Sequence, residues 1–243
     1  MSKQPDSGRS NVYPVWEQDI YAQGKALNRY PFNEVVSFVY RNYPRSKPRG
    51  EVRILEIGCG AGNNLWFAAR EGFNVTGLDG SASAIEFARK RFADEGLSGE
   101  FQVGDFSQLP FQNDRYDIVI DRAALTCSGF SYAQKTVAEV RRVLLPGGLF
   151  FFNPYSDRHS SYTSGKPGPD GLTIDITGGT LTDIGPLRFY GKRDILDMFR
   201  QGWQVVSLRH LEFTEELETL YDCHAEWILI AQKVVKVLRA AQD

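Results

Sequence analysis

The sequence has few of the residues that build metal centres or disulfide frameworks. Three cysteines occur among 243 residues, without a CxxC pair, and no cluster of histidines completes a zinc-ligand set. An odd number of widely spaced cysteines is typical of reduced thiols in a cytoplasm. We therefore predict a cytoplasmic protein without a metal site.

Charge of one sign and long apolar runs are also lacking. The formal net charge is −2, so no overall positive field would attract nucleic acid or anionic lipid. Residues 1–10 are polar and lack the apolar core of a secretory signal, and no apolar run has the length of a bilayer span. We expect no nucleic-acid partner and no membrane span, while the oligomeric state stays open.

Strand-like and helix-like segments alternate along the middle of the chain, which predicts a doubly wound α/β fold with a parallel sheet. The expected strands are 52–57, 74–78, 101–103, 116–120 and 149–153, and the expected helices are 63–71, 81–94 and 132–145. A short helix at 194–200 and two further strands at 203–213 and 226–235 bring the sheet to seven strands.

The other segments divide the chain into regions. Residues 1–12 are expected to be disordered, and residues 13–49 to form a helical cover and a linker. Residues 50–243 form the α/β domain, which contains an insert at about 154–190 that is rich in Ser, Gly, Thr and Pro.

A glycine-rich turn follows the first expected strand, as in sites that bind nucleotides. Its glycines are Gly58, Gly60 and Gly62, and they allow the backbone to turn tightly and approach a ligand. A dinucleotide fingerprint needs a glycine at position 63, where this chain has Asn63. Asp79 ends the second strand, where a carboxylate can bind ribose hydroxyls. The turn therefore predicts a nucleotide-like ligand other than NAD.

Five segments in order resemble motifs of the class I S-adenosylmethionine-dependent methyltransferases. They are VRILEIGCGAG at 52–62, VTGLD at 75–79, GDF with LPF at 104–111, YDIV at 116–119 and LLPGG at 144–148. The resemblance implies a Rossmann-like methyltransferase fold whose last strand is antiparallel. It also implies an enzyme with S-adenosyl-L-methionine as its cofactor.

The resemblance further implies where the cofactor lies. The methionine end meets the glycine loop, the ribose meets the end of the second strand, and the adenine follows the third. The end of the fourth strand lines the pocket near the transferred methyl. In that order the implied residues are Glu56, Gly58, Cys59 and Gly60; Asp79, Gly80 and Ser81; Asp105 and Phe106; and Asp121 and Arg122.

Two segments outside the α/β core are expected to close over this crevice. Class I enzymes often carry helices before the first strand, and Arg29 and Tyr30, together with Trp16 and Tyr21, fit such a cover. Arg29 would pair with the cofactor carboxylate. The insert, from 155 to 190, would form the other side. The alternative is that the aromatic residues before the first strand only pack against helices.

Methyl transfer needs a base only where the acceptor must lose a proton. His159 is the first candidate because the insert can reach the crevice, and Asp157 would orient it or act alone. His210 and His224 are weaker candidates. A hydrolase is disfavoured because no Gly-x-Ser-x-Gly elbow occurs.

The insert combines hydroxyl and aromatic residues, which favours a small hydroxylated acceptor such as a sugar. We therefore expect O-methylation of such a molecule. N-methylation of a small amine is the second hypothesis, and a non-catalytic S-adenosylmethionine-binding protein is the third.

Overall fold

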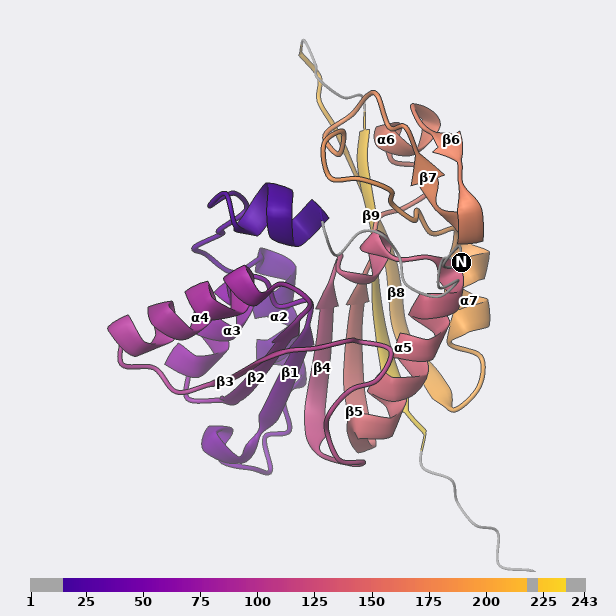
Figure 1. Cartoon of the computed structure of the whole chain (residues 1–243). Coiled ribbons are helices and arrows are strands. Elements are labelled where there is room, and N and C mark those ends of the chain that lie inside the picture. The colour runs from indigo at the N-terminus through magenta and orange to yellow at the C-terminus, as the bar shows by residue number, and fades with distance from the viewer. Residues whose placement is uncertain (1–14, 218–222, 235–243) are drawn as a thin grey trace, which may run out of the picture.

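Seven strands form one sheet in the order β3-β2-β1-β4-β5-β9-β8 (Figure 1). The structure is a computed structural model that describes residues 15–217 and 223–234. The strands are β1 (Arg53–Ile57), β2 (Asn74–Asp79), β3 (Glu100–Val103), β4 (Tyr116–Arg122), β5 (Leu144–Asn153), β8 (Trp203–Thr214) and β9 (Cys223–Lys233).

The pairings confirm the predicted mostly parallel sheet. β1 pairs in parallel with β2 and β4, β2 with β3, and β4 with β5. β9 is antiparallel to both of its neighbours, β5 and β8. The last strand therefore has the orientation that the family resemblance implied.

Helices cover both faces of the sheet, as a doubly wound fold requires. α2 (Asn33–Asn42), α3 (Asn63–Arg70) and α4 (Ala82–Asp94) share one core with Ile54 of β1. α5 (Phe130–Val143) and α7 (Lys192–Met198) share the other core with Leu55. Successive residues of a strand point to opposite faces, so β1 is buried on both sides.

The segment before β1 contains three helical elements. η1 (Trp16–Tyr21) is a single turn of π-helix, and residues with positive φ follow it at Gly24 (71°) and Ala26 (54°). The chain then enters α2, and η2 (Arg49–Glu51) leads into β1. η1 lies above the ends of the strands (Figure 1). The disorder predicted for residues 1–12 lies outside the described residues.

The insert after β5 contains short elements with a small core of their own. They are α6 (Ser160–Thr163), β6 (Lys166–Pro167), η4 (Pro169–Gly171) and β7 (Thr173–Ile174). Leu187 and Phe189 pack there with Ile176 and Leu181. The insert stands above the same end of the sheet as η1, across from it (Figure 1).

Local sequence signals set several element boundaries. Ser81 caps α4 as predicted, because its hydroxyl accepts from the N–H of Ala84 at 3.0 Å. α5 begins at Phe130, two residues earlier than expected. β5 begins at Leu144, whereas the sequence suggested a start after the glycines at 147 and 148.

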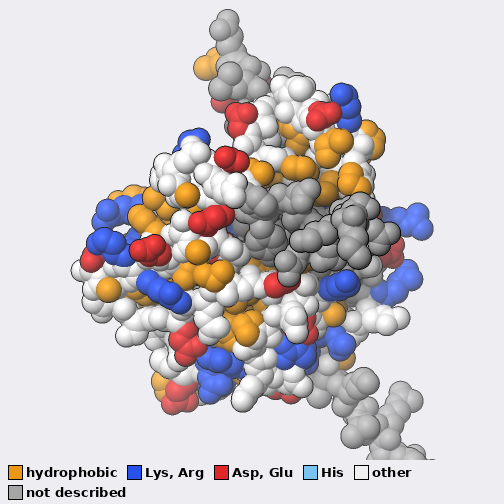
Figure 2. Space-filling view, viewed as in Figure 1, with side chains coloured by type: hydrophobic (Ala, Val, Ile, Leu, Met, Phe, Trp, Pro, Cys, Tyr) orange, Lys and Arg blue, Asp and Glu red, His pale blue; other side chains and the backbone are white. Residues whose placement is uncertain are grey.

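The surface gathers no single sign of charge on the face drawn in Figure 2, where acidic and basic side chains are interspersed. Among the described residues, no helix combines the length and apolar character that crossing a membrane needs.

Candidate active site

The glycine loop links β1 to α3 and lies against the end of β2. The N–H groups of Gly58 and Cys59 donate to the carbonyl of Leu78 at 2.7 and 3.2 Å. Gly58 and Gly60 have φ of +65° and +49°, a region that favours glycine. A Cβ on Gly58 would lie 2.1 Å from the Cβ of Ala124. The loop therefore needs a residue without a side chain at this position.

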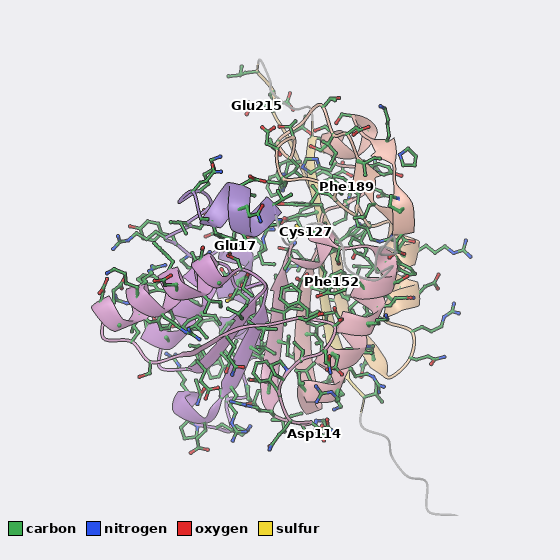
Figure 3. All side chains as sticks on the ribbon, in the orientation of Figure 1. Glu17, Asp114, Cys127, Phe152, Phe189 and Glu215 are labelled. Atoms are coloured by element: carbon green, nitrogen blue, oxygen red, sulfur yellow. The ribbon has the colours of Figure 1, made fainter. Side chains whose placement is uncertain are left out.

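A cavity of about 400 Å³ lies beside this loop, between the strand ends, η1 and the insert. Nine residues predicted to bind the cofactor line it: Glu56, Gly58, Cys59, Gly60, Asp79, Gly80, Ser81, Phe106 and Arg122. Figure 3 marks Glu17 on η1 and Cys127 at the cavity end of the sheet, with Asp114 at the opposite end. The cavity thus occupies the crevice at the carboxyl ends of the strands, where open α/β sheets bind ligands.

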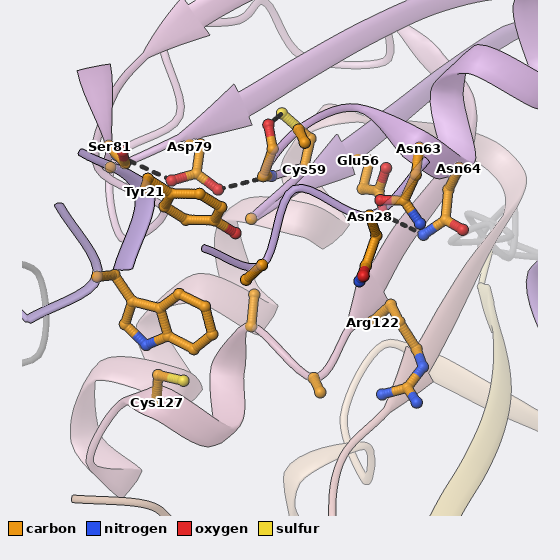
Figure 4. A pocket seen from close by; sticks show the side chains of 18 of the residues that line it. Tyr21, Asn28, Glu56, Cys59, Asn63, Asn64, Asp79, Ser81, Arg122 and Cys127 are labelled. Carbon is orange, nitrogen blue, oxygen red and sulfur yellow. Dashed lines mark hydrogen bonds between the residues drawn. The ribbon is translucent and has the colours of Figure 1, made fainter. Parts of the chain in front are cut away.

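Glu56 presents a carboxylate whose hydrogen bonding is incomplete. Its Oε1 accepts from the side-chain amide of Asn64 at 2.7 Å, while Oε2 has no hydrogen-bond partner among the described residues. Burial raises the pKa of Glu56 to about 8, and the carboxylates of Asp121 and Asp79 add to the shift. On one side of Figure 4 Glu56 lies with Asn64 and Arg122. A positively charged group of a bound ligand would supply the partner that Oε2 of Glu56 lacks.

Asp79 joins the glycine loop to the start of α4. Its Oδ2 accepts from the N–H of Gly60 and its Oδ1 from the N–H of Ser81, both at 2.8 Å (Figure 4). Burial raises the pKa of Asp79, although these backbone N–H groups oppose the shift. Its side chain therefore supports the loop in addition to facing the cavity.

η1 closes the cavity on the side of α4. The carboxylate of Glu17 accepts from the hydroxyl of Ser81 and from the N–H and hydroxyl of Ser83, the last two at 3.2 and 2.6 Å. These hydrogen bonds lower the pKa of Glu17. Tyr21 lies over Gly60, and burial raises the pKa of its hydroxyl, with a further contribution from Asp79. The hydrogen bonds of Glu17 attach η1 to the start of α4, which lies beside Asp79.

Six predicted site residues do not line the cavity: Arg29, Tyr30, Asp105, Asp121, Asp157 and His159. Tyr30 is 69% exposed, and its carbonyl accepts from the side chain of Asn63. The carbonyl of Arg29 accepts from Arg91. Asp121 is fully buried and accepts from the N–H of Leu125 at 3.0 Å.

The two groups expected at the adenine bind a tyrosine in this structure. The hydroxyl of Tyr132 donates to Asp105 at 2.7 Å and accepts from the N–H of Phe106 at 3.1 Å. Asp105 is exposed, while Phe106 and Tyr132 line the cavity. This contact could not be predicted from local sequence patterns, because Tyr132 belongs to α5, more than 20 positions further along the chain.

The histidine that lines the cavity is His224, not the first candidate His159. His159 is fully buried, and both ring nitrogens are engaged: Nδ1 accepts from the N–H of Ser161 at 3.0 Å, and Nε2 lies 3.2 Å from Nδ1 of His224. Burial lowers the pKa of His159 to about 4, with a contribution from His224. Asp157 forms no hydrogen bond with His159 in the described part of the chain; its Oδ1 accepts from the hydroxyl of Ser156.

Behind His224, an ion pair joins the end of β4 to β9. Nη2 of Arg122 lies 3.2 Å from Oε2 of Glu226, and the two side chains are only 11% and 4% exposed. Nε2 of His224 lies 3.7 Å from the same oxygen. The ring of Phe32 covers the Arg122 guanidinium at 4.3 Å. Glu226 lies 104 positions after Arg122, and no local pattern in the sequence links the two residues.

Chemically, the site offers carboxylates for a cationic ligand and lacks the ligands of a metal. Among the described residues, no three His, Cys, Asp or Glu side chains are grouped so that they could hold a metal ion.

Comparison with known proteins finds relatives for the central part of this chain. A family model described as a methyltransferase domain matches residues 54–148. The chain is 36% identical over 110 residues to the phthiotriol/phenolphthiotriol dimycocerosates methyltransferase of Mycobacterium tuberculosis, which is 44% of this chain and 38% of that protein. It is 32% identical over 142 residues to a fatty-acid O-methyltransferase of Mycolicibacterium smegmatis, which is 57% of this chain and 48% of that protein. The chain thus spans less than half of either relative.

A solved structure shares this fold. An S-adenosylmethionine-dependent methyltransferase from Methanosarcina mazei superposes with a TM-score of 0.67 and 22% identity. The superposition covers 82% of this chain and 98% of that one. At this identity the likeness establishes the fold.

Proposed function

Because this chain carries a class I, S-adenosylmethionine-dependent methyltransferase domain, we propose that it binds S-adenosylmethionine in the cavity beside Gly58 and transfers its methyl group to a small acceptor. The proposal rests on one observation: Glu56 has an unused carboxylate oxygen beside the glycine loop. An α-ammonium group supplies the cation that this buried oxygen lacks.

Other residues in the cavity wall suit the remainder of the cofactor. Asp79 faces the cavity and can accept from ribose hydroxyls while it keeps its bonds to the backbone. Tyr21 lies above Gly60, where its ring and hydroxyl can contact the sulfonium region. Bound S-adenosylmethionine supplies an electrophilic methyl group, so the protein mainly has to orient the acceptor and exclude water.

The acceptor we propose is a small hydroxylated molecule such as a sugar, methylated on oxygen. The cavity wall on the insert side combines the hydroxyls of Ser128 and Tyr155 with the imidazole of His224. Trp16 of η1 and Ile184 of the insert add apolar surface to the cavity. This mixture suits an acceptor with both hydroxyl groups and an apolar part.

The names of the two relatives favour a second class of acceptor, a lipid or fatty acid. N-methylation of a small amine and cofactor binding without catalysis are further alternatives. A panel of sugars, hydroxylated lipids, fatty acids and amines would separate them by the product that forms.

Calorimetry tests the cofactor first. S-adenosylmethionine and its demethylated product should bind in the micromolar range, about −7 to −9 kcal/mol. Glu56→Gln should weaken binding, whereas Glu51→Gln, an exposed carboxylate at the other end of β1, serves as the matched control. Folded wild-type protein that binds neither ligand would contradict the proposal.

A further inference from the structure

The cavity is lined by more acidic than basic side chains. Among the described residues that line it, Arg122 alone carries a fixed positive charge, while Glu56 and Asp79 supply carboxylates. These two carboxylates face the end of the cavity beside the glycine loop, so on the proposed function they pair with the cofactor. A negatively charged acceptor would therefore depend on Arg122 for its partner.

Arg122 already has a partner. Its Nη2 lies 3.2 Å from Oε2 of Glu226, and with both side chains almost wholly buried, water screens the pair weakly. Burial alone would raise the pKa of Glu226, but His224 and Arg122 hold it below its ordinary value. Glu226 is thus ionised, and the net charge of the pair is zero.

Both ring nitrogens of His224 face other groups of the protein. The N–H of Ser161 donates to Nδ1 of His159, so the proton of neutral His159 is on Nε2. That proton points to Nδ1 of His224, 3.2 Å away, which must then accept. Nδ1 of His224 therefore faces His159, and its Nε2 lies 3.7 Å from Oε2 of Glu226, so neither ring nitrogen is left without a protein neighbour.

From this arrangement we propose that the site selects an uncharged hydroxyl acceptor and rejects carboxylates, with Glu226 as the residue that sets this preference by neutralising Arg122. The inference rests on the proposed function and names its acceptor class. An acceptor carboxylate would enter a cavity in which Arg122 is already paired, and the carboxylate of Glu226 would repel it. An alcohol or phenol needs no counter-ion there.

The test uses matched acceptors that differ only in charge: octyl glucoside with octyl glucuronide, and decanol with decanoate. Binding to the complex with the demethylated cofactor is measured by calorimetry, and turnover is measured as kcat/KM. Wild-type protein should prefer the uncharged member of each pair by about 100-fold. Glu226→Gln should leave Arg122 without its partner and reduce the preference for the uncharged member of each pair by about 10-fold or more.

A matched control is Glu212→Gln on the neighbouring strand β8, whose carboxylate is 38% exposed and pairs with Arg158. It should leave the ratio unchanged. The melting temperature reports whether each variant folds. If Glu226→Gln does not fold, the preference of the wild-type protein for uncharged over carboxylate acceptors tests the inference.

Three results would overturn the inference: wild-type protein that binds the carboxylates as well as the alcohols, wild-type protein that binds neither uncharged compound, or folded Glu226→Gln that gains no affinity for either carboxylate. Failure of the proposed function is recognised separately, as cofactor binding without methylation of any compound in the acceptor panel.

Discussion

Binding of the cofactor should expel a proton from Glu56. The pKa of this carboxyl is raised to about 8 by burial, so near neutral pH the free protein holds it protonated. An ammonium group beside Oε2 would favour the ionised form and lower this pKa. The proton must then leave for the solvent when the ligand binds.

The size of the effect follows from this pKa. At pH 6.5 a carboxyl of pKa about 8 is ~97% protonated, so binding should release close to one proton. At this pH an α-amino group, of pKa about 7.7–8.0, is already charged and takes up little. Asp121, whose pKa burial raises to about 7, will take back a small part of the proton as Glu56 ionises.

Calorimetry at pH 6.5 in buffers of different ionisation enthalpy measures the number of protons released. Glu56→Gln removes the titrating group and should abolish most of the release, while Glu51→Gln should keep it. If wild-type protein and Glu56→Gln release the same number of protons, Glu56 does not pair with the ammonium group. The proposed role of Glu56 in binding the cofactor would then be refuted.

Four further outcomes are expected. Asp79→Asn should weaken cofactor binding by about 1.5–3 kcal/mol in calorimetry, because charge-assisted hydrogen bonds are lost; an unchanged affinity would exclude Asp79 as the ribose ligand. Chelators should leave turnover unaffected, and activity that is lost with a chelator and restored by magnesium would contradict a metal-free reaction. Hydrogen exchange should slow in residues 16–30 and 155–190 when the demethylated cofactor is added; slowing confined to the glycine loop would refute closure by these segments. The melting temperature of the free protein should fall as pH rises from about 4.5 towards 8, because folded Glu56 binds its proton more tightly than the unfolded chain does. Glu56→Gln should flatten this profile, and equal slopes for the two proteins would refute the raised pKa.

Partners that are close in sequence were predictable. The alternation of strands and helices, the glycine turn and the cap at Ser81 each depend on residues a few positions apart. The position of Asp79 at the end of β2 follows from the same local pattern, because parallel strands bring their carboxyl ends to one edge. Fold and cavity location could therefore be read from the sequence.

The acceptor side of the cavity could not be predicted in this way. His159 and His224 are 65 positions apart, and the sequence does not tell which of them faces the cavity and which is buried behind it. The pairing of Arg122 with Glu226 depends on β9 entering the sheet beside β5. The role of Asn64 could not be predicted, because its side-chain amide reaches Glu56 only when α3 packs against β1 in the folded chain.

The sequence by itself determined the elements, their order and the residues at the strand ends, because periodicity and turn chemistry act over short stretches of chain. The tertiary structure alone decided which side chains are buried together, and so which carboxyl groups have raised pKa values and which cation is already paired. Burial and charge pairing depend on distances between segments far apart in the chain, and those distances exist only in the folded molecule.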